Sequence, residues 1–245
     1  MKYIKIIKDF KLNLNIDVAE VLRYQGCKLN KESEISQNVM RIVEEEIRHG
    51  YELFVPQGIY RLLEIYRFIS PQRVELKDGY IFKFPERMTR LLKLADHLLL
   101  GIVTIGDLLE KEVSNLISRK EFPRALALDA VGTVAVEDLS RKIRELASQE
   151  IKKYGFNPST HFSPGYDGWD ITQQKIIFDL IPADQIGVIL TEGCMMFPRK
   201  SLSWLIGAVP VIQKEKINSL SSDESYHCKR CKLKSCQFRL DSHQK

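Results

Sequence analysis

This chain lacks any apolar run long enough to cross a bilayer, so we expect no membrane-spanning protein. Its most apolar window, residues 91–106, is interrupted by Lys93 and Asp96. A signal-peptide core is also missing, because Asp9 and Lys11 follow the basic N terminus too soon. We therefore expect a cytoplasmic protein with no membrane partner.

The chain also lacks a strong charge of one sign and any internal repeat. Its 37 basic and 32 acidic residues leave a net charge of +5 on a mixed surface. That excess permits nucleic-acid binding but does not require it. Tyr226 and Phe238 are the only aromatic residues near the basic C-terminal tail, which is thin support for base stacking. We do not expect nucleic acid as the partner.

Cysteine is scarce and unevenly distributed. Three of the five cysteines, Cys228, Cys231 and Cys236, follow C-x2-C-x4-C spacing. In a reducing compartment such bunching favours a metal site over disulfides. Three thiolates leave a four-ligand site incomplete, so the fourth ligand is either exogenous or one of these side chains: Cys27, Cys194, His227 and His243. Cys27 and Cys194 are also typical of small buried hydrophobic residues, and we expect them in that role.

The cysteine motif fits an iron–sulfur cluster or a structural zinc, and the third interpretation is a basic tail with free thiols. A polar run at residues 219–225 separates this tail from the preceding chain. We therefore expect one domain over residues 1–218, followed by a linker and a cysteine-rich metal-binding tail over residues 219–245.

Apolar residues at helical spacing predict a set of helices, which we place at 18–24, 35–50, 91–100, 124–153 and 171–180. Gly50 stands where a C-cap glycine belongs, and Asp170 is an expected N-cap. Small residues such as Ala130 and Gly132 give the longest helix a surface that can approach a neighbour closely.

Alternating or continuous apolar residues predict strands, which we place at 10–16, 74–76, 80–84, 186–190 and 202–212. Asp78-Gly79 is a hairpin turn signal between the second and third of these. The strand at 186–190 is expected to be buried. Gly207 and Pro210 suggest that the last strand is bent or lies at an edge. The mixed order of elements, with antiparallel pairs, predicts the α+β class.

The segment from His161 to Trp169 has the sequence His-Phe-Ser-Pro-Gly-Tyr-Asp-Gly-Trp. Proline fixes its own φ and Gly165 permits a positive φ, so the backbone can turn tightly there and present Tyr166 at its edge. Such a turn exposes main-chain donors and acceptors and suits recognition of a small polar ligand. The motif alone is more typical of an ordinary turn in which Tyr166 is a packing residue.

A second motif begins about twenty residues downstream. It consists of Thr191, Glu192, Met196, Pro198, Ser201 and Ser203. Together the two motifs resemble the reactivation domain of cobalamin-dependent methionine synthase, which has an arginine followed by x-x-Pro-Gly-Tyr and then Thr-Glu-Ser…Met…Pro…Ser-x-Ser. Continuous similarity covers residues 124–207. A weaker resemblance to small stand-alone relatives extends back to residues 21–26.

The resemblance implies a twisted antiparallel sheet flanked by helices and a site for S-adenosylmethionine. It assigns that site to His161, Ser163, Pro164, Gly165 and Tyr166, and a ligand or partner groove to Thr191, Glu192, Met196, Ser201 and Ser203. His161 departs from the family, which has arginine at this position. A mostly neutral histidine lacks the charged fork that pairs with a carboxylate, so the substitution weakens carboxylate recognition.

The resemblance implies no catalytic side chain. Reactivation of an oxidised cobalamin requires one electron from a donor and a methyl group from a sulfonium. The domain holds the methyl donor in line with cobalt. Glu192 is therefore expected to satisfy local backbone groups rather than to act as a base. Met195 and Met196 are expected in the core rather than as ligands.

The leading hypothesis is an accessory protein that supports reductive methylation of a partner. The 245 residues leave no room for homocysteine-, folate- or cobalamin-binding modules and lack the Asp-x-His-x-x-Gly segment that ligates cobalt. The chain would thus be one part of a methyltransferase system of methionine biosynthesis rather than a complete enzyme. Its expected partners are a corrinoid protein or split methionine synthase that carries cobalamin, and a flavodoxin- or ferredoxin-type electron donor. An iron–sulfur cluster fits this function best.

Two other functions remain open at this stage. The first is an iron–sulfur electron-transfer or redox-sensing protein that acts on a corrinoid protein without S-adenosylmethionine, which the His161 substitution favours. The second is a zinc-stabilised interaction protein, for which binding to polyanions would be sensitive to salt.

Overall fold

The computed structural model describes residues 3–8, 14–27 and 35–212. The linker at 219–225, the cysteine motif and most of the strand expected at 10–16 lie outside these residues. The described end of that expected strand, residues 14–16, is not in a strand, although Leu14 and Ile16 are buried.

A seven-stranded antiparallel sheet organises the described residues. Its strands are β1 (Tyr3–Ile7), β2 (Gln57–Ser70), β3 (Arg73–Leu76), β4 (Ile81–Lys83), β5 (His97–Thr104), β6 (Phe156–Phe162) and β9 (Ser201–Pro210). The order is β4-β3-β2-β5-β9-β6, and β1 pairs with β2. A separate hairpin pairs β7 (Ile189–Leu190) with β8 (Met196–Phe197). The α+β class and the Asp-Gly hairpin between β3 and β4 are confirmed.

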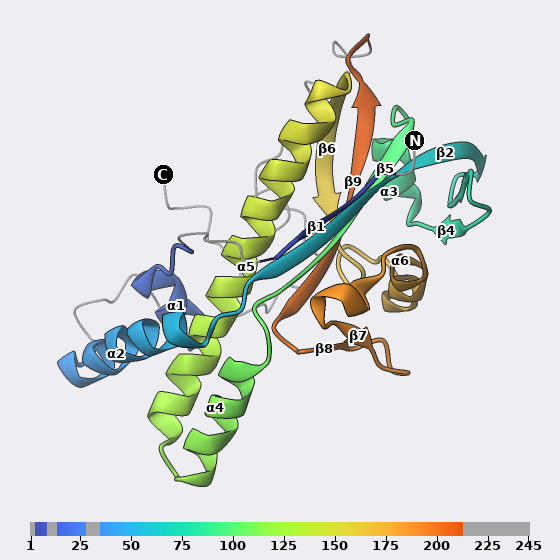
Figure 1. Ribbon diagram of the computed structural model, residues 1–245. Coiled ribbons are helices and arrows are strands. Elements are labelled where there is room, and N and C mark those ends of the chain that lie inside the picture. The colour runs from blue at the N-terminus through green and yellow to red at the C-terminus, as the bar shows by residue number, and fades with distance from the viewer. Residues whose placement is uncertain (1–2, 9–13, 28–34, 213–245) are drawn as a thin grey trace.

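Helices cover both faces of the sheet (Figure 1). They are α1 (Val18–Tyr24), α2 (Gln37–Leu53), α3 (Glu86–Leu92), α4 (Leu108–Ser118), α5 (Phe122–Lys153) and α6 (Gln174–Leu180), with short 3-10 turns η2 (Ile171–Gln173) and η3 (Ala183–Ile186). Apolar residues of α1, α2, α4 and α5 share one core with the sheet, and those of α3, α6 and η3 share the other. Among the described helices, none is long and apolar enough to cross a membrane.

The helix expected at 91–100 is wrong. The region contains the end of α3 and the first half of β5. Leu98 and Leu100 enter the core beside α6, whereas Leu99 enters the core beside α5. A strand buried on both faces is a continuous apolar run, and periodicity does not distinguish such a run from a helix.

Two further strands do not have the surroundings suggested for them, an edge position for the last strand and burial for the strand at 186–190. Strand β9 pairs with β5 on one side and β6 on the other, so it is not an edge strand. Pro210 is its last residue and therefore interrupts no ladder there. The expected buried strand at 186–190 is only the two residues of β7, and Ile189 is 56% exposed.

Gly50 is not a C-cap. It lies inside α2, whose C-cap is Phe54, and a Cβ at Gly50 would lie 2.8 Å from Cγ1 of Val131. The glycine therefore permits a close approach of α2 to α5. The longest predicted helix, at 124–153, is confirmed as α5.

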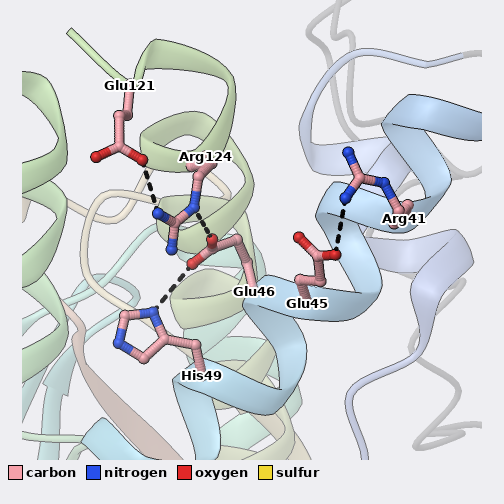
Figure 2. A network of polar contacts seen from close by, with 6 residues as sticks. All are labelled: Arg41, Glu45, Glu46, His49, Glu121 and Arg124. Carbon is pink, nitrogen blue, oxygen red and sulfur yellow. Dashed lines mark hydrogen bonds and ion pairs between the residues drawn. The ribbon is translucent and has the colours of Figure 1, made fainter.

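One turn before Gly50, a buried carboxylate joins α2 to α5 (Figure 2). Glu46 is 1% exposed, and its Oε1 accepts from Nε of Arg124 at 2.5 Å. The other oxygen lies 3.1 Å from Nδ1 of His49, and Arg124 also pairs with Glu121 at 2.7 Å. The Arg41–Glu45 pair on the same helix is exposed. A buried charge needs such partners, so this network fixes where α2 packs.

Gly101 of β5 allows the largest buried side chain to cross the sheet face. A Cβ there would lie 2.1 Å from a ring carbon of Trp204, which is fully buried in β9. We expect Gly101→Ala to destabilise the fold by about 2–3 kcal/mol through overpacking, measured by urea denaturation. Gly193→Ala is the control, because no atom lies within 4 Å of its added Cβ. Equal stability of the two variants would contradict this packing.

Asp138 of α5 holds the chain that leads into α1. Burial raises the pKa of its carboxyl, but hydrogen bonds from Lys142, the Asn15 backbone N–H and Arg141 outweigh burial and lower the pKa below 3.8. The ionised form is thus favoured in the folded state, and its contribution is lost as pH falls through the folded pKa.

We expect Asp138→Asn to lower the free energy of unfolding by about 1–2 kcal/mol at neutral pH, since charge-assisted bonds are lost. The difference in stability should shrink as the pH falls below about 4 and through the lowered pKa of the folded wild-type carboxyl. Denaturant titrations at several pH values measure it. A deficit independent of pH would show that the charge of Asp138 is not what stabilises this contact.

Candidate functional site

The segment 163–169 forms a compact turn at the end of β6. Gly165 has φ of +89°, and its N–H donates to the Trp169 carbonyl at 2.8 Å. The Trp169 N–H donates back to the Tyr166 carbonyl at 2.8 Å. Pro164 is buried, whereas Tyr166 is 66% exposed. The turn is therefore closed by its own backbone and presents the tyrosine outward.

Trp169 anchors this turn to the sheet. Its side chain is 2% exposed and packs near Phe82 and Phe84, with ring centroids 6.2 and 5.3 Å away. Its Nε1–H donates to the Lys83 carbonyl at 3.1 Å, and Gln173 accepts from the Lys83 N–H at 2.7 Å. No sequence pattern marks Trp169 for this role, although a buried tryptophan whose N–H finds a partner is typical of such an anchor.

Asp170 begins the next element, as predicted. Its side chain accepts from the backbone N–H of Thr172 at 2.8 Å and from the hydroxyl of the same residue at 2.6 Å. The hydrogen bond from the Thr172 hydroxyl lowers the pKa of the Asp170 carboxyl most, and the bond from the Thr172 N–H lowers it further. The cap starts η2, which leads directly into α6.

Gln174 links three parts of the site from inside the protein. It is 3% exposed; its Nε2 donates to the Cys194 carbonyl at 3.2 Å, and its Oε1 accepts from the Ser203 hydroxyl at 3.0 Å. Helix α6, the loop after β7 and strand β9 therefore meet at one amide. Gln174 could not be recognised from the sequence, because a lone glutamine in a helix carries no motif.

Arg61 of β2 holds the other end of α6. Its NH1 donates to the Leu180 carbonyl at 2.7 Å, and its NH2 pairs with Asp78 at 2.9 Å. A cation at the last carbonyls of a helix satisfies acceptors that have no partner within the helix. Both ends of this seven-residue helix are thus fixed by side chains from the sheet or its neighbours.

Thr191 closes the loop between β7 and β8. Its hydroxyl accepts from the Met195 N–H and lies within 3.0 Å of the Met195 carbonyl, and its backbone N–H donates to the same carbonyl at 2.9 Å. Glu192 is exposed. Met196 packs against the core beside α6, as expected, but Met195 is 62% exposed and is not a core residue.

The structure places the predicted site residues on two faces of the sheet. His161 is half-buried and pairs with Ile206, whose side chain belongs to the core beside α5; paired residues share a face, so His161 lies on the α5 face. Ser203 lies on the α6 face, where it meets Gln174. Ser201 is also buried, and its hydroxyl donates to the Pro198 carbonyl at 2.7 Å.

No metal site can be assigned within residues 3–8, 14–27 and 35–212, where no group of three or more acidic, histidine or cysteine side chains could hold a metal ion. Cys194 is buried, as expected, whereas Cys27 is only half-buried. The predicted metal ligands Cys228, Cys231 and Cys236 lie outside the described residues.

We expect Gln174→Leu to lower the free energy of unfolding by about 2–3 kcal/mol, because it leaves the Ser203 hydroxyl and the Cys194 carbonyl buried without this partner. Adding Ser203→Ala should recover part of the loss, since the unpaired hydroxyl is then removed. Lys175→Leu, an exposed change in the same helix, is the control. Strictly additive losses in the double variant, measured by chemical denaturation, would argue against a direct coupling.

Comparisons with known proteins place the fold. No known family profile and no curated protein matches the sequence. Among solved structures, the chain is similar to the MetH reactivation domain bound to AdoHcy, with a TM-score of 0.60 and 12% sequence identity over 85% of this chain and 79% of that one. The resemblance drawn from the two motifs is thus confirmed at the level of the fold: this chain has the fold of the methionine synthase reactivation domain.

Proposed function

We propose that this protein binds S-adenosylmethionine and acts as a reactivation module for a partner that carries cobalamin. The observation that carries the proposal is the turn at Ser163–Trp169, which is closed by its own backbone, anchored by a buried tryptophan and presents Tyr166 to solvent. The same turn carries the Pro-Gly-Tyr motif. The similar solved structure was determined with AdoHcy, the demethylated product of that methyl donor.

In this proposal the turn binds the ligand and the loop after β7 borders it. Gly165 permits the backbone to come close to the ligand, and Tyr166 offers an aromatic face with a hydroxyl. His161 takes the position at which the family has an arginine, so it supplies a weaker partner for the ligand carboxylate. Thr191 and Glu192 lie in the loop after β7, and Met196 lies in β8 directly after it. Ser201 and Ser203 contribute indirectly, because their hydroxyls are bound inside the protein.

The chemistry needs no protein base. S-adenosylmethionine supplies the methyl group, and the protein orients it toward a cobalamin that a partner corrinoid protein or methionine synthase carries. A flavodoxin- or ferredoxin-type protein would supply the electron. We further propose that Cys228, Cys231 and Cys236 hold an iron–sulfur cluster or zinc in the C-terminal tail. The protein would act as one part of a methyltransferase system.

A second candidate is an iron–sulfur electron-transfer protein that acts on a corrinoid protein without S-adenosylmethionine. The observation that favours it is His161, because the family arginine is the charged group that pairs with the carboxylate of the methyl donor. Stoichiometric iron in anaerobically purified protein, together with no binding of S-adenosylmethionine or AdoHcy, would support this candidate over the first.

Binding is tested by isothermal titration with S-adenosylmethionine and AdoHcy. We expect Tyr166→Ala to weaken affinity at least tenfold, because it removes an aromatic contact and a hydrogen-bonding group. Tyr66→Ala is the matched control: Tyr66 is 60% exposed, similar to Tyr166, but lies in β2 outside both motifs. Equal affinities of the two variants would remove Tyr166 from the site.

A substitution at His161 provides a test in which the affinity should rise. We expect His161→Arg to raise the affinity for both ligands about tenfold or more, since a charged hydrogen bond contributes about 1.5–3 kcal/mol. Analogues of the two ligands in which an amide replaces the carboxylate should show no gain in affinity from His161→Arg. If neither the wild type nor His161→Arg binds either ligand in the titration, the proposed function is wrong.

A further inference from the structure

The loop after β7 has a second attachment at its far end. Residues 191–198 are followed by Arg199 and Lys200, which lead into β9. The Lys200 backbone N–H donates to Oε1 of Glu110 at 2.7 Å, and its carbonyl accepts from the Ile105 N–H at 3.2 Å. The Glu110 side chain, in the first turn of α4, is only 8% exposed. A nearly buried carboxylate is thus committed to one backbone amide.

The Lys200 side chain makes a matching connection to α5. Its Nζ lies 2.9 Å from Oδ1 of Asp129 and 2.9 Å from the Thr133 hydroxyl, and the side chain is 13% exposed. Its stem passes over Gly132, where a Cβ would lie 3.2 Å from Cε of the lysine. One residue therefore ties the end of the loop to both helices of the α4–α5 pair.

The Glu110 and Lys200 side chains are largely shielded from water, whereas Asp129 is 47% exposed. Charge-assisted hydrogen bonds are about twice as strong as neutral ones, and a buried group that loses its partner is destabilised by its full desolvation. The Arg199–Glu110 pair, at 3.6 Å with the arginine 65% exposed, contributes little beside them. The strength of the attachment therefore comes from Glu110 and Lys200.

We propose that Glu110 and Lys200 are positioning residues for residues 191–198, which comprise the loop after β7 and strand β8. Gln174 fixes the loop at Cys194, and the Glu110–Lys200 pair fixes its far end against α4 and α5. The loop borders the ligand in the proposed function, and only the ligand-binding part of this inference rests on that function. Neither Glu110 nor Lys200 touches the turn at 163–169 in any contact described above, so they act through the loop.

Hydrogen–deuterium exchange tests the positioning role without a ligand. The Cys194 and Met195 amides report on the loop, because both donate to Thr191. We expect Lys200→Met and Glu110→Leu each to speed exchange of the 191–196 peptide about tenfold, the effect of one lost charge-assisted bond. Exchange of β2 and β5 should not change. Glu110→Gln, which keeps a neutral acceptor for the Lys200 N–H, should speed exchange of this peptide less than Glu110→Leu does.

Lys111→Met is the matched control, since Lys111 is 65% exposed and pairs only with Asp107 among the contacts described. Unchanged exchange of the 191–196 peptide in Lys200→Met and Glu110→Leu would overturn the proposal. Equally faster exchange in β2 and β5 would overturn it too, because the pair would then be a general stabiliser.

Titration with AdoHcy adds the functional arm. We expect Lys200→Met to weaken AdoHcy binding about three- to tenfold while Lys111→Met binds like the wild type. If the wild type fails to bind AdoHcy, the proposed function fails, but the exchange result still decides whether the pair positions the loop. Unchanged AdoHcy affinity combined with a loosened loop would overturn the link to the ligand.

Discussion

Strand β9 is the constraint on which the rest of the structure depends. It is hydrogen-bonded to β5 along one edge and to β6 along the other, and nearly all of its residues are buried. Its side chains alternate between two cores, so Trp204 packs beside α5 while Ser203 reaches Gln174 of α6. The core beside α5 and the core beside α6 therefore both pack against the same ten residues of β9.

The polar groups inside the two cores determine how the helices sit on this strand. Ser203 and Gln174 set the start of α6, Arg61 sets its end, and Glu46 sets where α2 meets α5. Each of these groups is costly to bury without a partner, so each specifies one arrangement and disfavours neighbouring ones. Apolar packing alone would leave the short helix α6 free to shift along the sheet.

The sequence predicted the helices that carry their own local signals. Helix α1, helix α5 and the Asp170 cap were found because their periodicity or capping chemistry is complete within a few residues. It missed β2 and β6, and it mistook part of β5 for a helix, because strand partners lie far away in the chain and a strand buried on both faces loses its alternation. Gly50 was misjudged for a related reason: its role depends on Val131, eighty-one residues away.

The candidate site was predictable where it is local and not where it depends on packing. The turn at Ser163–Tyr166 could be found because proline and glycine dictate its backbone. Gln174, Trp169 and Arg61 could not, since a single polar or aromatic residue has no pattern until the sheet supplies its partner. The motif therefore predicted the turn but not the contacts that hold it.

These contacts also distinguish motif residues that the fold requires from motif residues that it does not require. Ser201 and Ser203 of the downstream motif are bound inside the protein, so their match to the family follows from the requirements of the fold. His161 pairs with Ile206 across β6 and β9, and any non-proline residue can take part in such backbone pairing. A histidine at this position is therefore compatible with the ladder between β6 and β9. The likeness at 12% identity shows the fold alone, so the proposed ligand binding rests on the turn at 163–169.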